Sequence, residues 1–177
     1  MTNWMKWEEE YQKRTVSAEK AASVVKSGDF VCFTTGREAH SVGLAIASRF
    51  GDLKNVVINA PSPGYDFGWY DEGWKESFEL IIGMPTSTCQ DALDAGRVDI
   101  SVYGLIPLDR PPGNRQPDVV ITEVSPPDEN GFCSFGAACW NKKAEIRNAK
   151  ISIAEVNPSL IRPCGEDNYI HISEIDY

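Results

Sequence analysis

The sequence predicts an open α/β fold in which a mostly parallel sheet is flanked by helices. Two observations predict it. Short apolar runs are continuous rather than alternating, as expected of strands that are covered on both faces. These runs are separated by segments of helical composition, and such alternation builds parallel sheets through right-handed crossovers. We expect about six or seven strands and no second domain.

The first elements follow from local signals near the N-terminus. Residues 4–13 are charged and aromatic and predict a short amphipathic helix. Ser17 is a good N-cap for an alanine-rich helix that ends at the SGD turn. The run Phe30–Phe33 (FVCF) predicts a buried strand, and a glycine at position 36 ends it. A second helix is predicted over about 41–50.

The same alternation continues along the rest of the chain. Further strands are predicted over 55–59, 78–82, 98–103, 118–124 and 150–156, and further helices over 86–95 and 140–148. Two long connections remain, 60–77 and 104–117, and loops of such length in compact domains are usually functional or cover something.

Composition narrows the choice of partners and compartment. The 177 residues, 42% hydrophobic and 24% charged, fit a single domain spanning 1–177 with its own core. The net charge is −9 and no basic run exists, which argues against a nucleic-acid partner. No apolar run is long enough for a membrane span, and the polar N-terminus does not resemble a signal peptide. We therefore expect a cytoplasmic protein with no membrane partner.

Five cysteines and two histidines show no metal-binding spacing. There is no C-x-x-C pair, and an odd count argues against a disulfide framework, so no metal site is predicted. Cys32 lies inside an apolar strand and is predicted to be a small buried hydrophobe.

Candidate binding residues lie where predicted strands end, because open α/β sheets bind ligands beyond the carboxyl ends of their strands. Three connections qualify on this ground. The predicted substrate-binding residues in them are Gly36 and Arg37, then Ala60, Pro61 and Ser62, and finally Ser125, Pro126, Pro127, Gly131, Ser134 and Gly136.

The third connection is the most informative. Two prolines stiffen the exit from the strand, and Gly131 closes an Asp-Glu-Asn-Gly turn. Backbone N–H groups at Ser134 and Gly136 can then meet an anionic oxygen. The alternative is a tight structural turn between a strand and a helix.

The motifs around this connection resemble a known family. DVVITEVSPPDENGFCSFG, followed by NAKISIAEVNPSLIRPCGEDNYIHISEID, is similar to the acetyl-CoA hydrolase and 4-hydroxybutyrate CoA-transferase family. The stretches VSAEKAASVVKSGDFVCF and FELIIGMPTSTCQDALDAGRVDI fit the N-terminal domain of that family in order and spacing, so the likeness runs from Trp7 to Asp176.

This resemblance implies a class I CoA-transferase fold and a ping-pong mechanism. A glutamate carboxylate attacks an acyl-CoA thioester, and CoA then passes to an acceptor carboxylate. Coenzyme A and its thioesters are substrates, and no further cofactor is implied. The family's glutamate lies in the second half of a longer chain, so no catalytic residue is expected here, and a second subunit would carry that C-terminal half.

Glu123, Arg37 and His40 each allow two interpretations. Glu123 is a weak candidate for a nucleophile and is otherwise a paired carboxylate, whereas Glu155 is expected to brace the cleft wall. The segment from Gly36 to Ser41 lacks the proline that the family usually places there. Arg37 is either a clamp for a substrate carboxylate or a solvated cation. His40 is expected to start a helix, with a catalytic base as the alternative.

The leading hypothesis is therefore one subunit of a heteromeric acyl-CoA transferase or hydrolase that supplies a wall of the acyl pocket. The alternatives are a lyase or decarboxylase on the same scaffold, a non-catalytic acyl-CoA-binding or regulatory module, and a piece of a longer chain. Trp and Tyr side chains near 65–74 are expected to be exposed and would suit the subunit interface.

Overall fold

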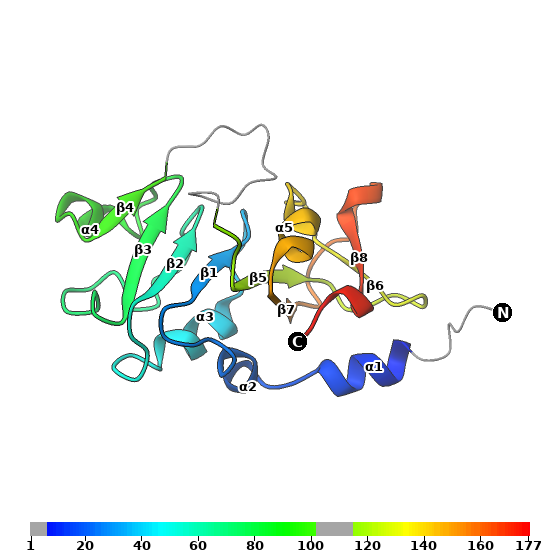
Figure 1. Ribbon diagram of the computed structural model, residues 1–177. Coiled ribbons are helices and arrows are strands. Elements are labelled where there is room, and N and C mark those ends of the chain that lie inside the picture. The colour runs from blue at the N-terminus through cyan, green and yellow to red at the C-terminus, as the bar shows by residue number, and fades with distance from the viewer. Residues whose placement is uncertain (1–6, 102–114) are drawn as a thin grey trace.

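A six-stranded parallel sheet forms the centre of the computed structural model, which describes residues 7–101 and 115–177 (Figure 1). The strand order is β4-β3-β2-β1-β5-β7, and every neighbouring pair is parallel. The strands are β1 (Phe30–Phe33), β2 (Val56–Ala60), β3 (Phe78–Ile82), β4 (Val98–Ile100), β5 (Val119–Val124) and β7 (Ile151–Val156). The predicted fold class is confirmed.

Helices and a small ribbon cover the two faces of this sheet. The helices are α1 (Trp7–Arg14), α2 (Ala18–Ala22), α3 (His40–Ala47), α4 (Gln90–Asp94) and α5 (Lys142–Asn148), with short 3-10 turns η3 (Glu166–Asn168) and η4 (Ile172–Glu174). The strands β6 (Phe132–Ser134) and β8 (Tyr169–His171) form an antiparallel pair. No helix in the described ranges has the length and apolarity that a membrane crossing requires.

The continuous apolar runs are explained by two separate cores. Val31 and Phe33 of β1 pack with α2 and α3 on one face, whereas Phe30 and Cys32 pack with α5 and the β6–β8 ribbon on the other. In Figure 1, α2 and α3 lie together below the sheet, and α5, β6 and β8 lie at the β5–β7 end. Because both faces of the central strands are covered, apolar residues occupy successive positions, and the strand sequences do not alternate between apolar and polar residues.

Several boundaries differ from the predictions. The helix expected over 86–95 shortens to α4, because Thr86 and Cys89 form a hydrogen-bonded turn before it. The predicted strand 98–103 is described only as far as β4, and most of the loop 104–117 lies outside the described residues. The sequence analysis missed β6 and β8, since strands of three residues carry no periodic signal.

The prediction of exposed Trp and Tyr between residues 65 and 74 is wrong for Trp69 and Tyr70, whereas Tyr65 and Trp74 are half-buried. Phe67, Trp69 and Tyr70 keep only 5%, 2% and 4% of their surface exposed. Their rings form a chain of contacts that reaches β1, with Phe67 and Trp69 centroids 6.3 and 5.9 Å from that of Phe33. The connection after β2 therefore folds back into the core beside α3, and burial of these large rings stabilises the fold instead of an interface.

Close packing of Phe67 explains a glycine inside α3. A Cβ placed on Gly43 would lie 2.5 Å from the nearest carbon of the Phe67 ring, and that ring is held by its aromatic neighbours. At Gly64, by contrast, a Cβ would meet its nearest atom at an ordinary 3.8 Å.

We predict that Gly43→Ala destabilises the protein, although alanine normally stabilises a helix by about 1 kcal/mol over glycine. Overpacking against Phe67 outweighs that gain, so the free energy of unfolding should fall by about 1–2 kcal/mol. Chemical denaturation measures it, with Gly64→Ala as the matched control that should change stability by under about 0.5 kcal/mol. A Gly43→Ala protein as stable as the parent would contradict this packing.

A half-buried carboxyl group on α5 makes the fold sensitive to pH. Burial raises the pKa of Glu145 from 4.5 to about 7, against the opposing effects of a hydrogen bond from Asn141 and the charge of Lys142. Its Oε2 atom is buried and has no partner among the described residues.

The stability of the protein should therefore fall as the pH rises from about 5 to 7.5. In this window the unfolded carboxyl group has already lost its proton while the folded one still holds it, so each step in pH favours unfolding. Glu145→Gln should flatten this profile and raise the melting temperature at pH 7.5. Equal pH profiles for the parent and the Glu145→Gln protein would show that the group does not titrate in this range.

Candidate substrate cleft

A cleft of about 340 Å³ opens at the carboxyl ends of the central and edge strands. Its lining comes from the ends of β5 and β7, the start of α3 and the segments that follow β1, β2 and β7, and consists of Arg37, His40, Ser41, Tyr65, Glu123, Glu155, Val156, Asn157 and Pro158. It lies at the point where the strand order reverses, because β1 is followed in space by β2 on one side and by β5 on the other. Open α/β sheets bind ligands at such switch points.

A buried carboxylate fixes an arginine at this cleft. The Glu123 side chain is only 5% exposed, and its Oε1 atom lies 3.2 Å from Arg37 Nε. Asn157 Nδ2 donates a hydrogen bond of 2.8 Å to the same oxygen. The Arg37 side chain is 59% exposed, and its terminal nitrogens make no hydrogen bond within the described part of the chain. Glu123 thus contacts the arginine at one nitrogen only, and the two terminal nitrogens of this cleft-lining residue stay available for a ligand.

The same geometry argues against Glu123 as a nucleophile. One of its oxygens, Oε1, accepts a hydrogen bond from Asn157 and forms the ion pair with Arg37, and the other, Oε2, is buried from solvent without a hydrogen-bond partner in the described ranges. A thioester could reach Oε1 only by displacing Arg37 or Asn157, and burial closes Oε2 off from a substrate.

Glu155 braces the cleft wall from the edge strand β7. Its Oε1 accepts from Ser41 Oγ at 3.0 Å, and its Oε2 accepts from the backbone N–H of Val42 at 3.0 Å. The residue at the N-cap position of α3, Ala39, has no side-chain acceptor of its own. A carboxylate 113 residues away therefore caps this helix, where negative charge is favoured.

We predict that Glu155→Ala lowers the free energy of unfolding by about 1–2 kcal/mol, because two donors at the start of α3 lose their acceptor. Glu155→Gln should recover part of the loss, since its amide oxygen still accepts one bond. Denaturant titration measures both changes. Glu79→Ala, at an exposed position of β3, is the control, and a loss as large in that protein would refute the capping role.

Glu38 joins the first two connections. It is 2% exposed, and its Oε2 accepts from the N–H groups of Gly64 and Tyr65 at 2.8 and 3.1 Å. Burial raises the pKa of this carboxyl group, against the lowering effect of those two bonds. The Gly36 N–H donates to Ser62 Oγ at 3.3 Å, so the structure brings these two predicted residues together. Ala60 and Pro61 are also nearby in sequence, but both are buried.

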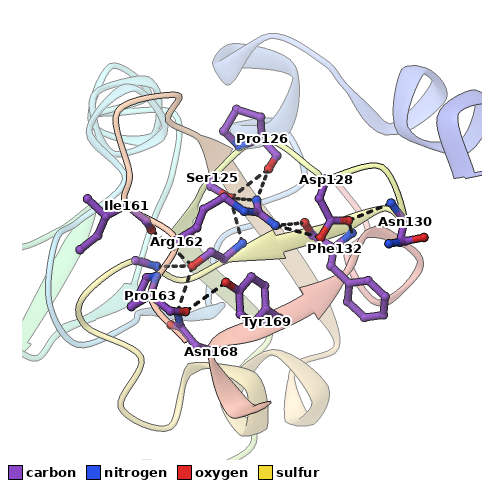
Figure 2. Close-up of polar contacts among 12 residues, drawn as sticks. Ser125, Pro126, Asp128, Asn130, Phe132, Ile161, Arg162, Pro163, Asn168 and Tyr169 are labelled. Carbon is purple, nitrogen blue, oxygen red and sulfur yellow. Dashed lines mark hydrogen bonds and ion pairs between the residues drawn. The ribbon is translucent and has the colours of Figure 1, made fainter. Parts of the chain in front are cut away.

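The third connection is held by an arginine that the sequence analysis missed (Figure 2). Arg162 donates hydrogen bonds to Ser125 Oγ, the Pro126 and Phe132 carbonyls and Asp128 Oδ2, at 2.6, 2.8, 3.0 and 3.1 Å in that order. Its guanidinium lies 5.3 Å from the centre of the Tyr169 ring. Most of its partners are more than thirty positions away and half of them are backbone carbonyls, so no motif points to it.

The N–H groups expected to meet an anion in this connection are engaged inside the chain. The Ser134 N–H donates to Ser125 Oγ at 2.9 Å, and the Gly136 N–H donates to Ser134 Oγ at 3.1 Å. Pro126, Pro127 and Gly131 lie in the same clamped turn. None of these residues lines the 340 Å³ cleft, and their role in substrate binding stays a prediction.

The cleft instead contains residues that the sequence analysis did not assign to binding. Tyr65 contacts His40, with ring centroids 4.6 Å apart, and Asn157 follows β7 directly. The rule that ligands bind after parallel strands applied to β7 as well, and it would have found Asn157. His40 begins α3, as expected.

Comparisons with known proteins identify the family. Residues 102–177 match the acetyl-CoA hydrolase/transferase N-terminal domain. The chain is 33% identical to a 4-hydroxybutyrate coenzyme A transferase of Clostridium kluyveri, over 98% of this chain and 41% of that protein. It belongs to this family of acetyl-CoA hydrolases and CoA-transferases. The resemblance found in the sequence is confirmed, including its restriction to the N-terminal domain.

One further relative agrees with this assignment, and one solved structure shows the same fold. A succinyl-CoA:cyclohexane-1-carboxylate CoA transferase of Geobacter metallireducens is 31% identical over 97% of this chain and 39% of its own length. The crystal structure of RipA from Yersinia pestis superposes with a TM-score of 0.84 at 22% identity, over 94% of this chain and 42% of that chain, which shows the fold. The chain thus spans about two fifths of the length of the relatives it matches.

Proposed function

We propose that this chain is one part of an acyl-CoA transferase or hydrolase, supplies one wall of its acyl pocket, and acts with a second polypeptide that carries the nucleophilic glutamate. The observation that carries the proposal is Arg37, which lines the cleft at the switch point and pairs with the buried Glu123 through its Nε atom alone. The names of the relatives support a reaction that moves CoA between carboxylic acids.

Such a reaction needs a group that attracts a carboxylate without becoming acylated. A guanidinium meets this need, because it stays charged and binds a carboxylate through two parallel hydrogen bonds. Glu123 neutralises part of the charge of Arg37 but contacts only its Nε atom. The outer nitrogens of Arg37 therefore bind the acceptor carboxylate, while His40 and Tyr65 close the side of the pocket.

The nucleophile must then come from outside the cleft wall described here. Glu123 and Glu155 both line the cleft, and both are committed to hydrogen bonds that build it. In the complete enzyme, a glutamate of the second polypeptide attacks the thioester carbonyl carbon and the CoA thiolate leaves. The thiolate then attacks the glutamyl carbonyl of the anhydride and releases the acyl carboxylate. The acceptor carboxylate next attacks the glutamyl thioester and expels the thiolate, which attacks the acceptor carbonyl of this second anhydride to form the new acyl-CoA and free the glutamate.

The proposal is tested by purifying this chain alone and together with the polypeptide encoded by the neighbouring reading frame. CoA transfer from acetyl-CoA to butyrate, followed by chromatography, should appear only in the combined preparation. Hydroxylamine should trap an activated glutamate on the second polypeptide. Transfer by this chain alone would refute the need for a second polypeptide.

The alternatives predict other outcomes in the same preparation. Release of CO₂ from an acyl-CoA without any hydroxylamine-sensitive intermediate would identify a decarboxylase. Binding of acyl-CoA without turnover would identify a regulatory module. Either result would overturn the transferase proposal.

In the active preparation, Arg37→Lys should raise the KM for the acceptor carboxylate about tenfold while changing kcat less, because lysine cannot make the bidentate contact. Arg115→Lys is the matched control, because Arg115 is a half-exposed arginine that pairs with Asp118 at the amino ends of β1 and β5, away from the cleft. An unchanged KM in the Arg37→Lys enzyme would place the acceptor elsewhere.

A further inference from the structure

A buried lysine lies next to the candidate cleft and has no part in the proposed function as described so far. Lys142 is the first residue of α5 and is only 2% exposed. Burial lowers the pKa of its ammonium group, against the raising effect of the Glu123, Glu145 and Cys139 charges. Among the described residues, its Nζ atom has no ion-pair or hydrogen-bond partner.

This position of the ammonium group is unfavourable for folding. A buried charge without a direct partner loses its hydration and receives little in return. A cation at the first position of a helix also opposes the helix dipole. Charges that a fold retains against such costs are concentrated at functional sites, so Lys142 calls for a role other than stability.

The ammonium group lies beneath the turn that carries Arg37. Gly36 adopts a φ of +108°, and a Cβ placed on it would lie 2.8 Å from Ala138 Cβ and 3.8 Å from Lys142 Nζ. The turn after β1 therefore packs directly on the segment that begins α5. Arg37 follows in the chain and lines the cleft, whereas Lys142 does not line it. Any effect of Lys142 on a ligand is thus exerted through its charge and not through contact.

The charges of the cleft lining show why a further cation is needed. At pH 8, where histidine and tyrosine are ordinarily neutral, the ionised side chains of the lining are Arg37, Glu123 and Glu155. One positive charge thus stands against two negative charges, in a chain whose net charge is −9. Such a cleft repels a carboxylate, and the charge of Lys142, which acts on Glu123, offsets this excess.

We propose that Lys142 is a positioning residue for the carboxylate substrate, because its buried charge offsets that of Glu123 and leaves the guanidinium of Arg37 for the substrate. The inference rests on the proposed function, which assigns the acceptor carboxylate to Arg37. A charge in the interior acts over a longer range than one in water, so direct contact with the substrate is not required.

Glu145 opposes this effect from the same helix. It lies three positions after Lys142, and burial raises the pKa of its carboxyl group to about 7. At pH 8 Glu145 is therefore ionised and counteracts the charge of Lys142. Removing the charge of Lys142 and removing that of Glu145 should consequently change carboxylate binding in opposite directions.

Thermal denaturation of Lys142→Met separates a functional charge from a structural one. Methionine keeps the length and apolar character of the side chain, and Glu123 keeps its contacts with Arg37 and Asn157. The melting temperature should stay equal or rise, because an unpaired buried charge is removed. A clearly lower melting temperature would show that the ammonium serves the fold, and it would overturn the proposal.

Carboxylate binding can be measured on this chain alone by titration with sodium butyrate at pH 8 and constant ionic strength. The NMR signal of the Arg37 Nε–H group reports the binding. Lys142→Met should raise the dissociation constant about fivefold to tenfold. Lys143→Met is the matched control, because it removes the same charge from the same helix, and the Lys143 ammonium donates to the Glu166 carbonyl instead. Equal dissociation constants for the two variants, or no binding by the parent chain, would overturn the proposal.

Glu145→Gln provides the opposite shift in the same titration. At pH 8 it should lower the dissociation constant for butyrate at least about twofold, because the negative charge beside Lys142 is removed. A structural role for Lys142 predicts no such gain. A Glu145→Gln chain that binds butyrate no more tightly than the parent would show that charge beneath the turn does not act on the site.

Kinetics of the active preparation distinguish this inference from the proposed function. Lys142→Met should raise the KM for butyrate by the same factor as the dissociation constant, with a smaller change in kcat. An unchanged KM in that enzyme would overturn the role of Lys142 while leaving the transferase proposal intact. If no preparation transfers CoA but the butyrate titrations shift as expected, the proposed function fails and the role of Lys142 in carboxylate binding stands.

Discussion

The parallel pairing of β1 with β5 is the constraint on which the cleft depends. It joins residues 88 positions apart, as in the hydrogen bond of 3.0 Å between the hydroxyls of Thr34 and Thr122. A parallel pair in the middle of a sheet is stable only when both faces are covered, and the two cores meet this condition. Because the two strands end side by side, Arg37 and Glu123 meet at the same edge, although neither lies near the other in the sequence.

The electrostatics of that edge follow from the burial of Glu123. A carboxylate that is 95% removed from solvent requires a cationic or hydrogen-bonding partner, and Arg37 and Asn157 provide both. The ion pair that stabilises the buried charge also restrains the orientation of the arginine. An arginine on a loop would otherwise sample many rotamers, and the ordering cost would fall on substrate binding. Glu123 is therefore better understood as a positioning group than as a reagent.

The sequence predicts most of the sheet and little of the cleft, for a physical reason. Strand runs such as FVCF are visible because both cores demand apolar residues, and this demand is local to the strand. The contacts of the cleft are not local. Glu155 caps a helix 113 residues away. Arg162 binds backbone carbonyl groups, which every residue type carries and which therefore leave no pattern in the sequence. The aromatic residues around Trp69 were misplaced because composition does not distinguish a packed loop from an exposed one.

The edge strand β7 and the start of α3 are joined by the Glu155 side chain at the cleft. The backbone of Glu155 pairs with β5, while its side chain holds the start of α3 through Ser41 and Val42. His40 begins the same helix, and its ring lies 4.6 Å from that of Tyr65 in the cleft. The place of His40 in the pocket therefore depends on a carboxylate that a different strand supplies, because the N-cap residue of the helix has no side-chain acceptor of its own.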